Sequence, residues 1–384
     1  AGGAALTVNP AVANNGGVGL HVVKSGPGDV TLAGPLSHTG GTALGAGTLT
    51  VETPASTVRD FPAGGISGSG ALKLTGAGTL SFPNVANTYL GTTTVAAGTA
   101  RILNNATFGS AAAPTVVQNG GAIDFWGTGD QSMNINAEAI YAEGTGPDGL
   151  GALRNTGSYS QYNAIRLLTL TGDLGIYTPK RLDARNASGA STVDLNGHGI
   201  VKKGSDMFGL TGVSVVNDQN TAFIDVEQGS VTFEVGTTLT GGAANFVRIR
   251  NGAYFDYYDL YSPVNWEMRL DGGSRVYTRM GNATNRNVWA GPVTLGGSAT
   301  FESGSTFSDT YTGVISGSGP LVKTGSDHGI TFLRNSGNTW TAGTTISSAI
   351  LYAFEPGALP GYDTSVTVNG TGCLALRVAD AAAT

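Results

Sequence analysis

The amino-acid sequence predicts an all-β chain wound as a β-solenoid, in which short strands stack coil upon coil. Glycine accounts for 61 of the 384 residues, while 40% of residues are hydrophobic and only 12% are charged. The hydrophobic residues sit in short alternating runs such as Gly-Thr-Leu-Ser-Phe at 78–82, which favours short strands joined by tight turns. A disordered chain would carry fewer apolar residues, and no amphipathic helix of useful length is visible.

An internal repeat supports the solenoid, because solenoids are built from self-similar units of about 20–50 residues. Three blocks recur in the same order. They are Ile-Ser-Gly-Ser-Gly at 66–70 and 315–319, the Asn-Thr-aromatic block at 87–93 and 338–345, and Val-x-x-Asn-Gly at 116–120 and 366–370. We expect matched residues to occupy equivalent corners of different coils.

A shorter element, an apolar residue followed by lysine and glycine, occurs four times. The copies are residues 22–26, 72–76, 200–204 and 321–325. In the second copy the lysine, Lys73, stands one position early. A slip of one residue turns a side chain to the other side of a strand, so Lys73 should point away from the side that the other three lysines face.

These residues resemble the autotransporter-associated β-strand repeat. The resemblance is closest over residues 72–100, while residues 22–49 carry Ser-His-Thr at 37–39 in place of the Asn-x-Tyr portion. Residues 321–351 have Asp327 where the repeat has its second glycine, and residues 200–235 form a degenerate copy. The residues expected to serve the repeat structurally are Gly26, Gly76, Asn87, Gly91, Gly204, Gly325, Asn338 and Gly343.

The resemblance implies a right-handed parallel β-helix in the secreted passenger part of a large bacterial surface protein. Glycine and asparagine would supply corners with positive φ. We expect a single continuous solenoid over 1–384, secreted to the cell surface or the extracellular space. Its parts would be repeat-like segments at 22–51, 66–126, 200–235 and 315–378, and a divergent aromatic-rich segment at 246–289.

Charge and composition exclude several partners. The formal net charge of −6 argues against nucleic acid, and no apolar run reaches the roughly 18 residues that a membrane span needs. The single cysteine, Cys373, lies in an apolar run and is expected to be a small core residue. Neither the beginning of the chain nor its end shows a polar or helical cap. We therefore expect the coils to continue in a longer parent chain or copies to stack head to tail.

Catalytic signatures are weak. The glycine-flanked serines Ser69 and Ser318 mark repeat boundaries, and the four histidines lack metal-ligand spacing, with His38 expected in a turn. Carboxylates with arginines between 254 and 279 could serve a carbohydrate-active enzyme, or simply be outward positions of strands. We predict that the chain is not an enzyme and needs no cofactor or metal, although calcium stays open.

The segment 246–289 combines aromatic residues with arginines, the residue types enriched in binding hot spots. The expected ligand or partner contacts are Tyr254, Tyr257, Tyr258, Tyr261, Trp266, Arg269, Tyr277 and Trp289. The alternative is that these rings fill the interior of a widened coil. The sequence therefore predicts a structural or adhesive surface element that could contact a surface polysaccharide. A carbohydrate-active β-helix enzyme and a receptor-binding fibre module are the alternatives.

Overall fold

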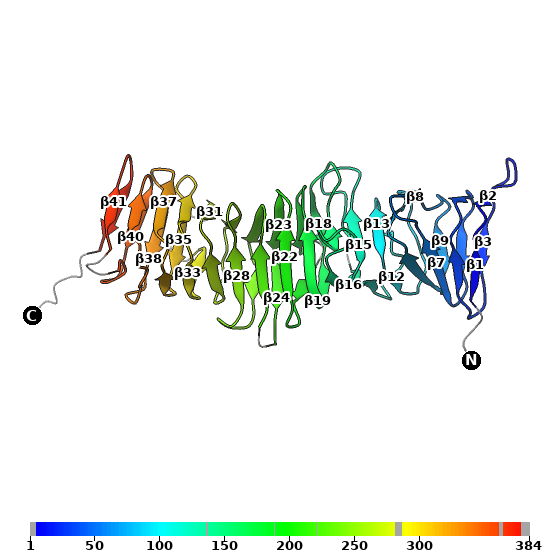
Figure 1. Ribbon diagram of the computed structural model, residues 1–384, viewed down its shortest axis with the longest axis horizontal. Helices are drawn as coiled ribbons and strands as arrows, with labels where there is room; N and C mark the ends of the chain where they lie inside the picture. The colour runs from blue at the N-terminus through cyan, green and yellow to red at the C-terminus, as the bar shows by residue number, and fades with distance from the viewer. Residues whose placement is uncertain are drawn as a thin grey trace, which may run out of the picture. The chain divides into compact units, whose positions relative to one another are not determined.

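The computed structural model describes residues 5–135, 137–187, 189–219, 221–280, 286–360 and 364–377. Among these residues every regular element is a β-strand and no helix occurs (Figure 1). The strands belong to two compact units, residues 1–194 and 195–384.

The first unit holds strands β1–β21, most of them two to six residues long. Their bounds are β1 (Leu6–Val8), β2 (Val12–Ala13), β3 (Val22–Lys24), β4 (Val30–Leu32), β5 (Leu36–Ser37), β6 (Thr42–Leu44), β7 (Thr48–Glu52), β8 (Val58–Asp60), β9 (Ile66–Gly68), β10 (Ala71–Thr75), β11 (Thr79–Ser81), β12 (Thr93–Val95), β13 (Gly98–Ile102), β14 (Thr115–Val117), β15 (Gly121–Phe125), β16 (Ala139–Gly144), β17 (Leu153–Arg154), β18 (Gln161–Ile165), β19 (Leu167–Tyr177), β20 (Leu182–Arg185) and β21 (Ser191–Asp194). One parallel ladder runs β1-β4-β7-β10-β12-β14-β16-β19-β21, and a second runs β8-β11-β13-β15-β17-β19.

The second unit holds strands β22–β42. Their bounds are β22 (Gly199–Lys203), β23 (Met207–Thr211), β24 (Val213–Val216), β25 (Phe223–Val226), β26 (Ser230–Glu234), β27 (Thr238–Leu239), β28 (Phe246–Ile249), β29 (Tyr254–Tyr258), β30 (Glu267–Leu270), β31 (Ser274–Met280), β32 (Val288–Trp289), β33 (Val293–Leu295), β34 (Ala299–Ser303), β35 (Ser308–Tyr311), β36 (Ile315–Gly317), β37 (Leu321–Gly325), β38 (Ile330–Leu333), β39 (Thr344–Ile346), β40 (Ile350–Ala353), β41 (Val366–Val368) and β42 (Cys373–Leu376). Three parallel ladders carry the coils: β22-β25-β28-β30-β33-β36, β23-β26-β29-β31-β34-β37-β39-β41 and β32-β35-β38-β40-β42.

The pairing register gives the length of a coil. Met207 lies opposite Ser230, 23 residues further along the chain, and Ala299 lies opposite Leu321, 22 residues further along. Each strand thus pairs with its counterpart in the next coil, and the pairing is parallel. Each unit is therefore a parallel β-solenoid, which confirms the predicted fold class.

The core of each unit forms from alternating residues of the strands, because successive side chains point to opposite sides. In β7 and β10 the inward leucines Leu49 and Leu72 are in register and fully buried. The residues next to each leucine along its own strand are half-buried. Burying a leucine contributes about 1.5–3 kcal/mol. The same inward position recurs in each coil, so each hydrophobic residue is covered only when its neighbouring coils are present.

The repeat asparagines tie adjacent coils together at buried corners. Asn87 accepts a hydrogen bond from the Ile66 amide at 2.8 Å and donates to the Thr107 carbonyl at 2.6 Å. Asn338 repeats this geometry, accepting from the Ile315 amide at 2.8 Å and donating to the carbonyl of Ala358 at 2.7 Å. The two residues therefore occupy equivalent corners, as the repeat requires.

An aromatic ring two residues after each asparagine also has an equivalent place. Tyr89 and Trp340 are fully buried, and each hydrogen-bonds the threonine four residues later. His38 does the same in the first repeat, its Nε2 lying 3.2 Å from the Thr42 hydroxyl. His38 therefore lies at a corner outside the strands, as expected, but it is buried there. It is only 2% exposed because it fills the corner that a larger ring fills in the other copies.

The repeat glycines serve two purposes. The four that follow the lysine have positive φ: Gly26, Gly76, Gly204 and Gly325. Gly91 and Gly343 instead allow close approach, since a Cβ atom on Gly91 would lie 2.3 Å from the Gly70 carbonyl oxygen and one on Gly343 would lie 2.9 Å from the Ser365 hydroxyl.

Three of the four repeat lysines point inward. Lys24, Lys202 and Lys323 are at most 3% exposed, and Lys202 donates to the carbonyl oxygens of Gly204 and Gln228, both at 2.8 Å. Lys73 is half-buried, on the other side of its strand from the buried Leu72 and Leu74. The one-residue shift in the sequence thus reverses the direction of the lysine.

Cys373 is exposed, so the prediction that it is a core residue is wrong. The register explains this. The inward Leu351 pairs with Leu374, which leaves Cys373 opposite the half-buried Ile350 on the outward side of β42.

We predict that Asn87→Ala lowers the free energy of unfolding by about 2–3 kcal/mol, because it removes two buried hydrogen bonds and leaves their partners unsatisfied. Urea unfolding followed by circular dichroism measures the change. Asn84→Ala, at an exposed position three residues earlier, is the control and should cost less than about 1 kcal/mol. Equal losses in the two variants would contradict the structural role of Asn87.

Lys202 should make stability depend on pH. Burial lowers its pKa from 10.5 to about 7, opposed by the nearby charge of Asp206. Between these values the unfolded chain binds one more proton than the folded chain. The free energy of unfolding should therefore rise by up to about 1.4 kcal/mol per pH unit between pH 7 and 10.5. This gain in stability is lost as pH falls back towards 7.

Unfolding of the native chain and of Lys202→Met across this pH range tests the effect, with the outward Lys73→Met as the control for losing one charge. The difference between the native chain and Lys202→Met should grow as pH falls. A difference that is constant with pH would show that Lys202 titrates equally in both states.

Candidate functional site

The aromatic side chains of the segment 246–289 separate by burial into an interior set and an outward set. Tyr257, Trp266 and Trp289 are fully buried. Tyr257 and Trp289 pack edge to face in a cluster with Phe255, whose ring centroid lies 5.4 Å from that of Trp289. These three predicted contact residues are therefore not available at the surface. Strand alternation turns Tyr257 and Trp289 inward, and Trp266 is buried at the bend before β30.

The outward tyrosines lie on β29 and β31, and each faces an arginine. The guanidinium carbon of Arg275 is 4.6 Å from the ring centroid of Tyr254 and 5.1 Å from that of Tyr277. Arg279 lies 5.3 Å from the ring of Tyr258. We call Tyr254, Tyr258 and Tyr277 with these two arginines the tyrosine–arginine face. Cation–π contacts hold its rings in place while they remain half-buried.

Tyr261 lies at the corner after β29 and is 47% exposed. The guanidinium of Arg286 lies 3.5 Å from its ring centroid and 3.8 Å from the Asp259 carboxylate. Asp259 has a φ of +52° and forms the turn that brings Tyr261 outward. This corner extends the set of rings available at the surface.

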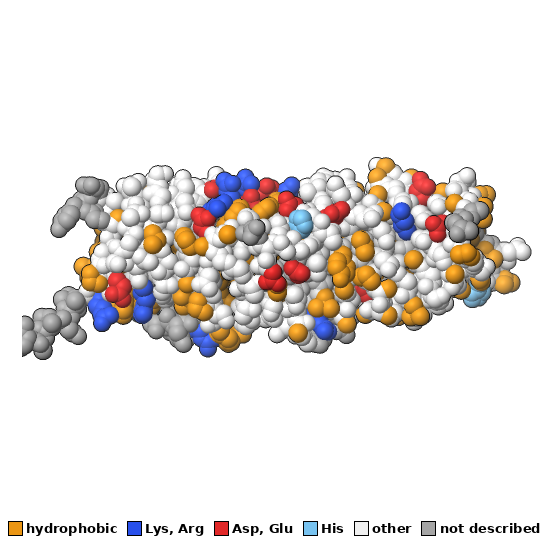
Figure 2. Space-filling view, turned by 90° about the horizontal axis from the view of Figure 1, so that it is seen from below, with side chains coloured by type: hydrophobic (Ala, Val, Ile, Leu, Met, Phe, Trp, Pro, Cys, Tyr) orange, Lys and Arg blue, Asp and Glu red, His pale blue; other side chains and the backbone are white. Residues whose placement is uncertain are grey.

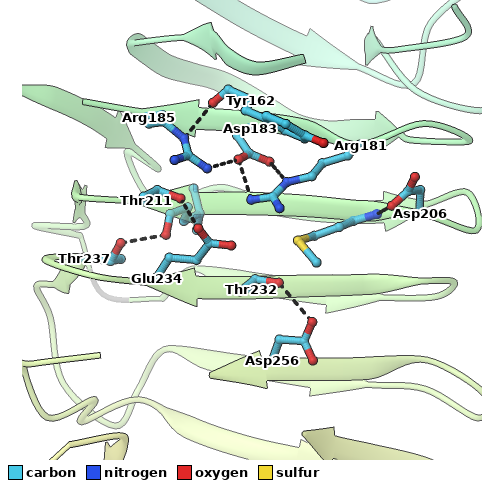
Figure 3. A network of polar contacts seen from close by, with 12 residues as sticks. Tyr162, Arg181, Asp183, Arg185, Asp206, Thr211, Thr232, Glu234, Thr237 and Asp256 are labelled. Atoms are coloured by element: carbon cyan, nitrogen blue, oxygen red, sulfur yellow. Dashed lines mark hydrogen bonds and ion pairs between the residues drawn. The ribbon is translucent and has the colours of Figure 1, made fainter. Parts of the chain in front are cut away.

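Arg279 reaches back from β31 across two earlier coils to cover outward polar residues. Its Nε lies 3.1 Å from the Asp256 carboxylate, and its Nη2 lies 3.4 Å from Glu234 and 3.3 Å from the Thr232 hydroxyl. Figure 3 shows Thr232 beside Asp256 and Glu234 beside Thr211 on successive strands. Burial raises the pKa of Asp256 to about 6, although Arg279 opposes the rise.

Arg269 lies on a different ladder, on the outward side of β30. Its guanidinium carbon is 3.7 Å above the ring centroid of Phe246, and it makes an ion pair with Glu267 at 2.7 Å. Phe246 in turn stacks on Phe223 with centroids 5.6 Å apart and planes 14° from parallel. On the face drawn in Figure 2, basic and acidic side chains are interleaved rather than segregated by sign, and most of that face is uncharged.

Of the acidic residues considered for catalysis, Glu267 and Asp271 border the same cleft, while Asp256, Asp259 and Asp271 lie apart from one another. Asp256 lies on β29, Asp259 at the corner after it, and Asp271 directly after β30 on another ladder, 2.9 Å from Arg248. Each of the three is ion-paired with a different arginine. In the described part of the chain, no group of three or more His, Cys, Asp or Glu side chains is placed to hold a metal ion. The described residues also contain no helix long and apolar enough to cross a membrane.

A polar cluster inside the second unit was not foreseen from the sequence. Asp309 is buried and accepts hydrogen bonds from Thr331 at 2.9 Å and Ser303 at 3.2 Å. The ammonium group of Lys323 donates to Ser303 at 2.6 Å, and burial lowers the pKa of this lysine to about 8. The inward position of the repeat lysine was the one signal for this cluster, since Asp309 lies outside the repeated blocks.

Comparison with known proteins gives one curated relative, the adhesin BmaC autotransporter of Brucella suis biovar 1 (strain 1330). It is 25% identical over 512 aligned residues, which cover 99% of this chain and 15% of the relative. The chain thus spans about a seventh of the length of that relative. No solved structure gives a significant match.

The passenger-associated-transport-repeat family matches residues 22–51, 72–99 and 321–352. These are three of the four places where the lysine–glycine element occurs. The chain carries autotransporter passenger β-repeats. The predicted resemblance is confirmed, and the family implies secretion to the cell surface or the extracellular space. In this passenger protein the matched repeats carry the corner asparagines and two of the inward lysines, whereas the aromatic–arginine segment lies between them.

We predict that Arg279→Leu destabilises the passenger protein by about 2–4 kcal/mol at pH 7, because it leaves the Asp256 carboxylate buried without its cation. The loss should shrink as pH falls towards about 6 and level off below it, because removing Arg279 raises the pKa of Asp256 further and below about 6 this carboxyl is protonated in both proteins. Denaturant unfolding at several pH values measures both effects.

Arg275→Leu is the matched control on the same strand. Arg275 pairs with Glu302 at 3.0 Å, but the two side chains are 39% and 29% exposed, so its loss should cost less than about 1 kcal/mol. A loss for Arg279→Leu that is as small, or that does not change with pH, would contradict the proposed role of Arg279.

Proposed function

We propose that this passenger protein is an adhesive surface element and that the tyrosine–arginine face, extended by Tyr261, contacts its target. The observation that carries the proposal is that four tyrosines of one segment stand at the surface, each beside an arginine. The relative from Brucella suis is named as an adhesin, which agrees with this function.

The physical basis is the suitability of such rings for binding. Tyrosine offers a large contact area with few rotatable bonds, so little conformational entropy is lost on binding. A tyrosine ring that an arginine already holds in place loses still less conformational entropy on binding. Tyrosine and arginine are also the side chains that most often dominate the binding energy of an interface. Of the predicted contacts, Tyr254, Tyr258, Tyr261, Tyr277 and Arg269 therefore stay in the proposal.

We further propose that the chain does not act as an enzyme. A carbohydrate-active enzyme needs two carboxyl groups on either side of the bond that is cleaved. Asp256 is 1% exposed and Glu234 is 5% exposed, and both lie under Arg279. A substrate would have to displace this arginine to reach them. Glu267 and Asp271 border one cleft, but each is held in an ion pair with an arginine.

We also propose that this chain is one segment of a longer parent protein. The share of the curated relative that the chain covers fits a longer parent chain. A continuous solenoid over 1–384, head-to-tail stacking of copies and a receptor-binding fibre all stay predictions. Imaging of the purified chain over a concentration series would separate free particles from filaments.

We predict that replacing Tyr258, Tyr261 and Tyr277 together with alanine lowers binding of the purified chain to its target surface at least about tenfold, as expected for the loss of one to two hot-spot contacts. Binding is measured on epithelial cells, bacterial cells and matrix-coated plates. Tyr159→Ala removes a 44% exposed tyrosine of the first unit and is the control. Equal binding by the triple variant and the control would overturn the proposed contact face.

A further inference from the structure

A column of flat side chains runs along the outward side of three successive strands. Phe223 on β25 stacks on Phe246 of β28, and the Arg269 guanidinium of β30 covers the other face of Phe246 at 3.7 Å. The strands pair in register, with Phe223 opposite Phe246. The column therefore advances one coil at a time and has Arg269 as its last member.

Beyond Arg269 the outward positions become small, and a cleft opens. The next strand, β33, presents Thr294, and Gly296 follows it. The cleft has a volume of about 190 Å³. Its walls include Arg248, Glu267, Arg269, Asp271, Thr294 and Gly296. One side of the Arg269 guanidinium is covered by Phe246, so its other side borders the cleft.

The polar groups around the cleft are held in place by ion pairs but keep hydrogen-bonding capacity for a ligand. Arg248 uses Nε and Nη2 on Asp271, and Arg269 uses Nε and Nη2 on Glu267. Thr294 donates to the second oxygen of Glu267 at 2.9 Å. Among the described residues neither Nη1 group has a protein acceptor, and the two arginine side chains are 39% and 43% exposed. Each guanidinium can donate further while its ion pair holds it in position.

The charges of the cleft cancel. Two arginines face two carboxylates, and each pair is within 3 Å. An anionic ligand would gain from the arginines but would also meet the carboxylates of Glu267 and Asp271, so the cleft does not select for negative charge. It offers a flat surface, donors, acceptors and little net charge.

From this geometry we infer that the cleft binds a neutral sugar unit of a glycan chain. A pyranose ring has an apolar C–H face, which can lie against the Arg269 plane, and a rim of hydroxyl groups that both donate and accept. Its hydroxyls would donate to Glu267 and Asp271 and accept from the free Nη1 groups of the arginines. The cleft is open at the surface, so the chain can continue beyond the bound unit. This inference rests on the proposed adhesive function and names a class of target for it.

The test is binding of the purified 384-residue chain to immobilised glycans. The neutral probes are mannan, galactan, dextran and xyloglucan, and the acidic probes are polygalacturonate and heparan sulfate. We expect at least one neutral glycan to bind. Arg269→Ala should weaken that binding at least about tenfold, and Arg269→Lys, which keeps the charge but loses the flat surface, should weaken it to a similar extent.

The matched control is Arg101→Ala in the first unit. Arg101 lies 3.9 Å above the Trp126 ring and 3.5 Å from Asp124, the same combination of stacking and ion pairing without the cleft. Its glycan binding should equal that of the native chain, and circular dichroism checks that each variant is folded.

Several outcomes would overturn the inference: no neutral glycan bound, binding of acidic glycans only, native binding by Arg269→Ala, full rescue by Arg269→Lys, or a target that is a protein resistant to glycosidase treatment. The outcome for the proposed function is separate. If the chain adheres to cells through the tyrosines but ignores neutral glycans, the adhesive function stands and the glycan inference fails. If Arg269-dependent glycan binding is found but adhesion to cells survives replacement of the three tyrosines, the glycan inference stands and the tyrosine–arginine face fails as the contact instead.

Discussion

Parallel hydrogen bonding between successive coils is the constraint on which the rest of this structure depends. Strands of three to five residues, such as β4 and β7, cannot be stable by themselves, and their backbone groups are satisfied by the coil before and the coil after. Because the register is kept from coil to coil, a side chain meets its counterpart roughly 4.8 Å away. A residue type whose side chain packs well against the same residue type in the next coil can therefore recur at equivalent positions.

The inward corners show how this constraint admits polar residues. A buried asparagine is tolerated because the same two backbone groups, one in each neighbouring coil, are always in reach, as at Asn87 and Asn338. A buried lysine is tolerated for a similar reason, since Lys202 meets two carbonyl oxygens at the turn. These groups are costly to bury without partners, so they help to fix the register as well as the fold.

The outward positions are under a weaker constraint, and this is where the chain differs from one segment to another. On this side the matched repeats present threonine at many positions and single larger residues such as Lys73, while the segment 246–289 presents tyrosine, phenylalanine and arginine. Stacking along the axis organises these residues too. An arginine of one coil covers a ring of another at Phe246, and the same kind of contact holds Tyr254. The proposed binding chemistry is thus added to a scaffold whose interior it does not disturb.

The sequence by itself determined the class of fold, the repeats and the special corners, because these depend on period-two alternation and on glycine and asparagine at fixed spacing. It also determined that Lys73 points the other way. Only the tertiary structure decided which aromatic residues face outward. In the run 254–258 (Tyr-Phe-Asp-Tyr-Tyr) both sides of the strand carry rings, so alternation alone cannot tell the buried Tyr257 from the outward Tyr258. Nor could the sequence place Arg279 over Glu234, 45 residues earlier. Residues that lie one or two coils apart in space are separated by about twenty to fifty residues in the chain, and only the register of the coils brings them together.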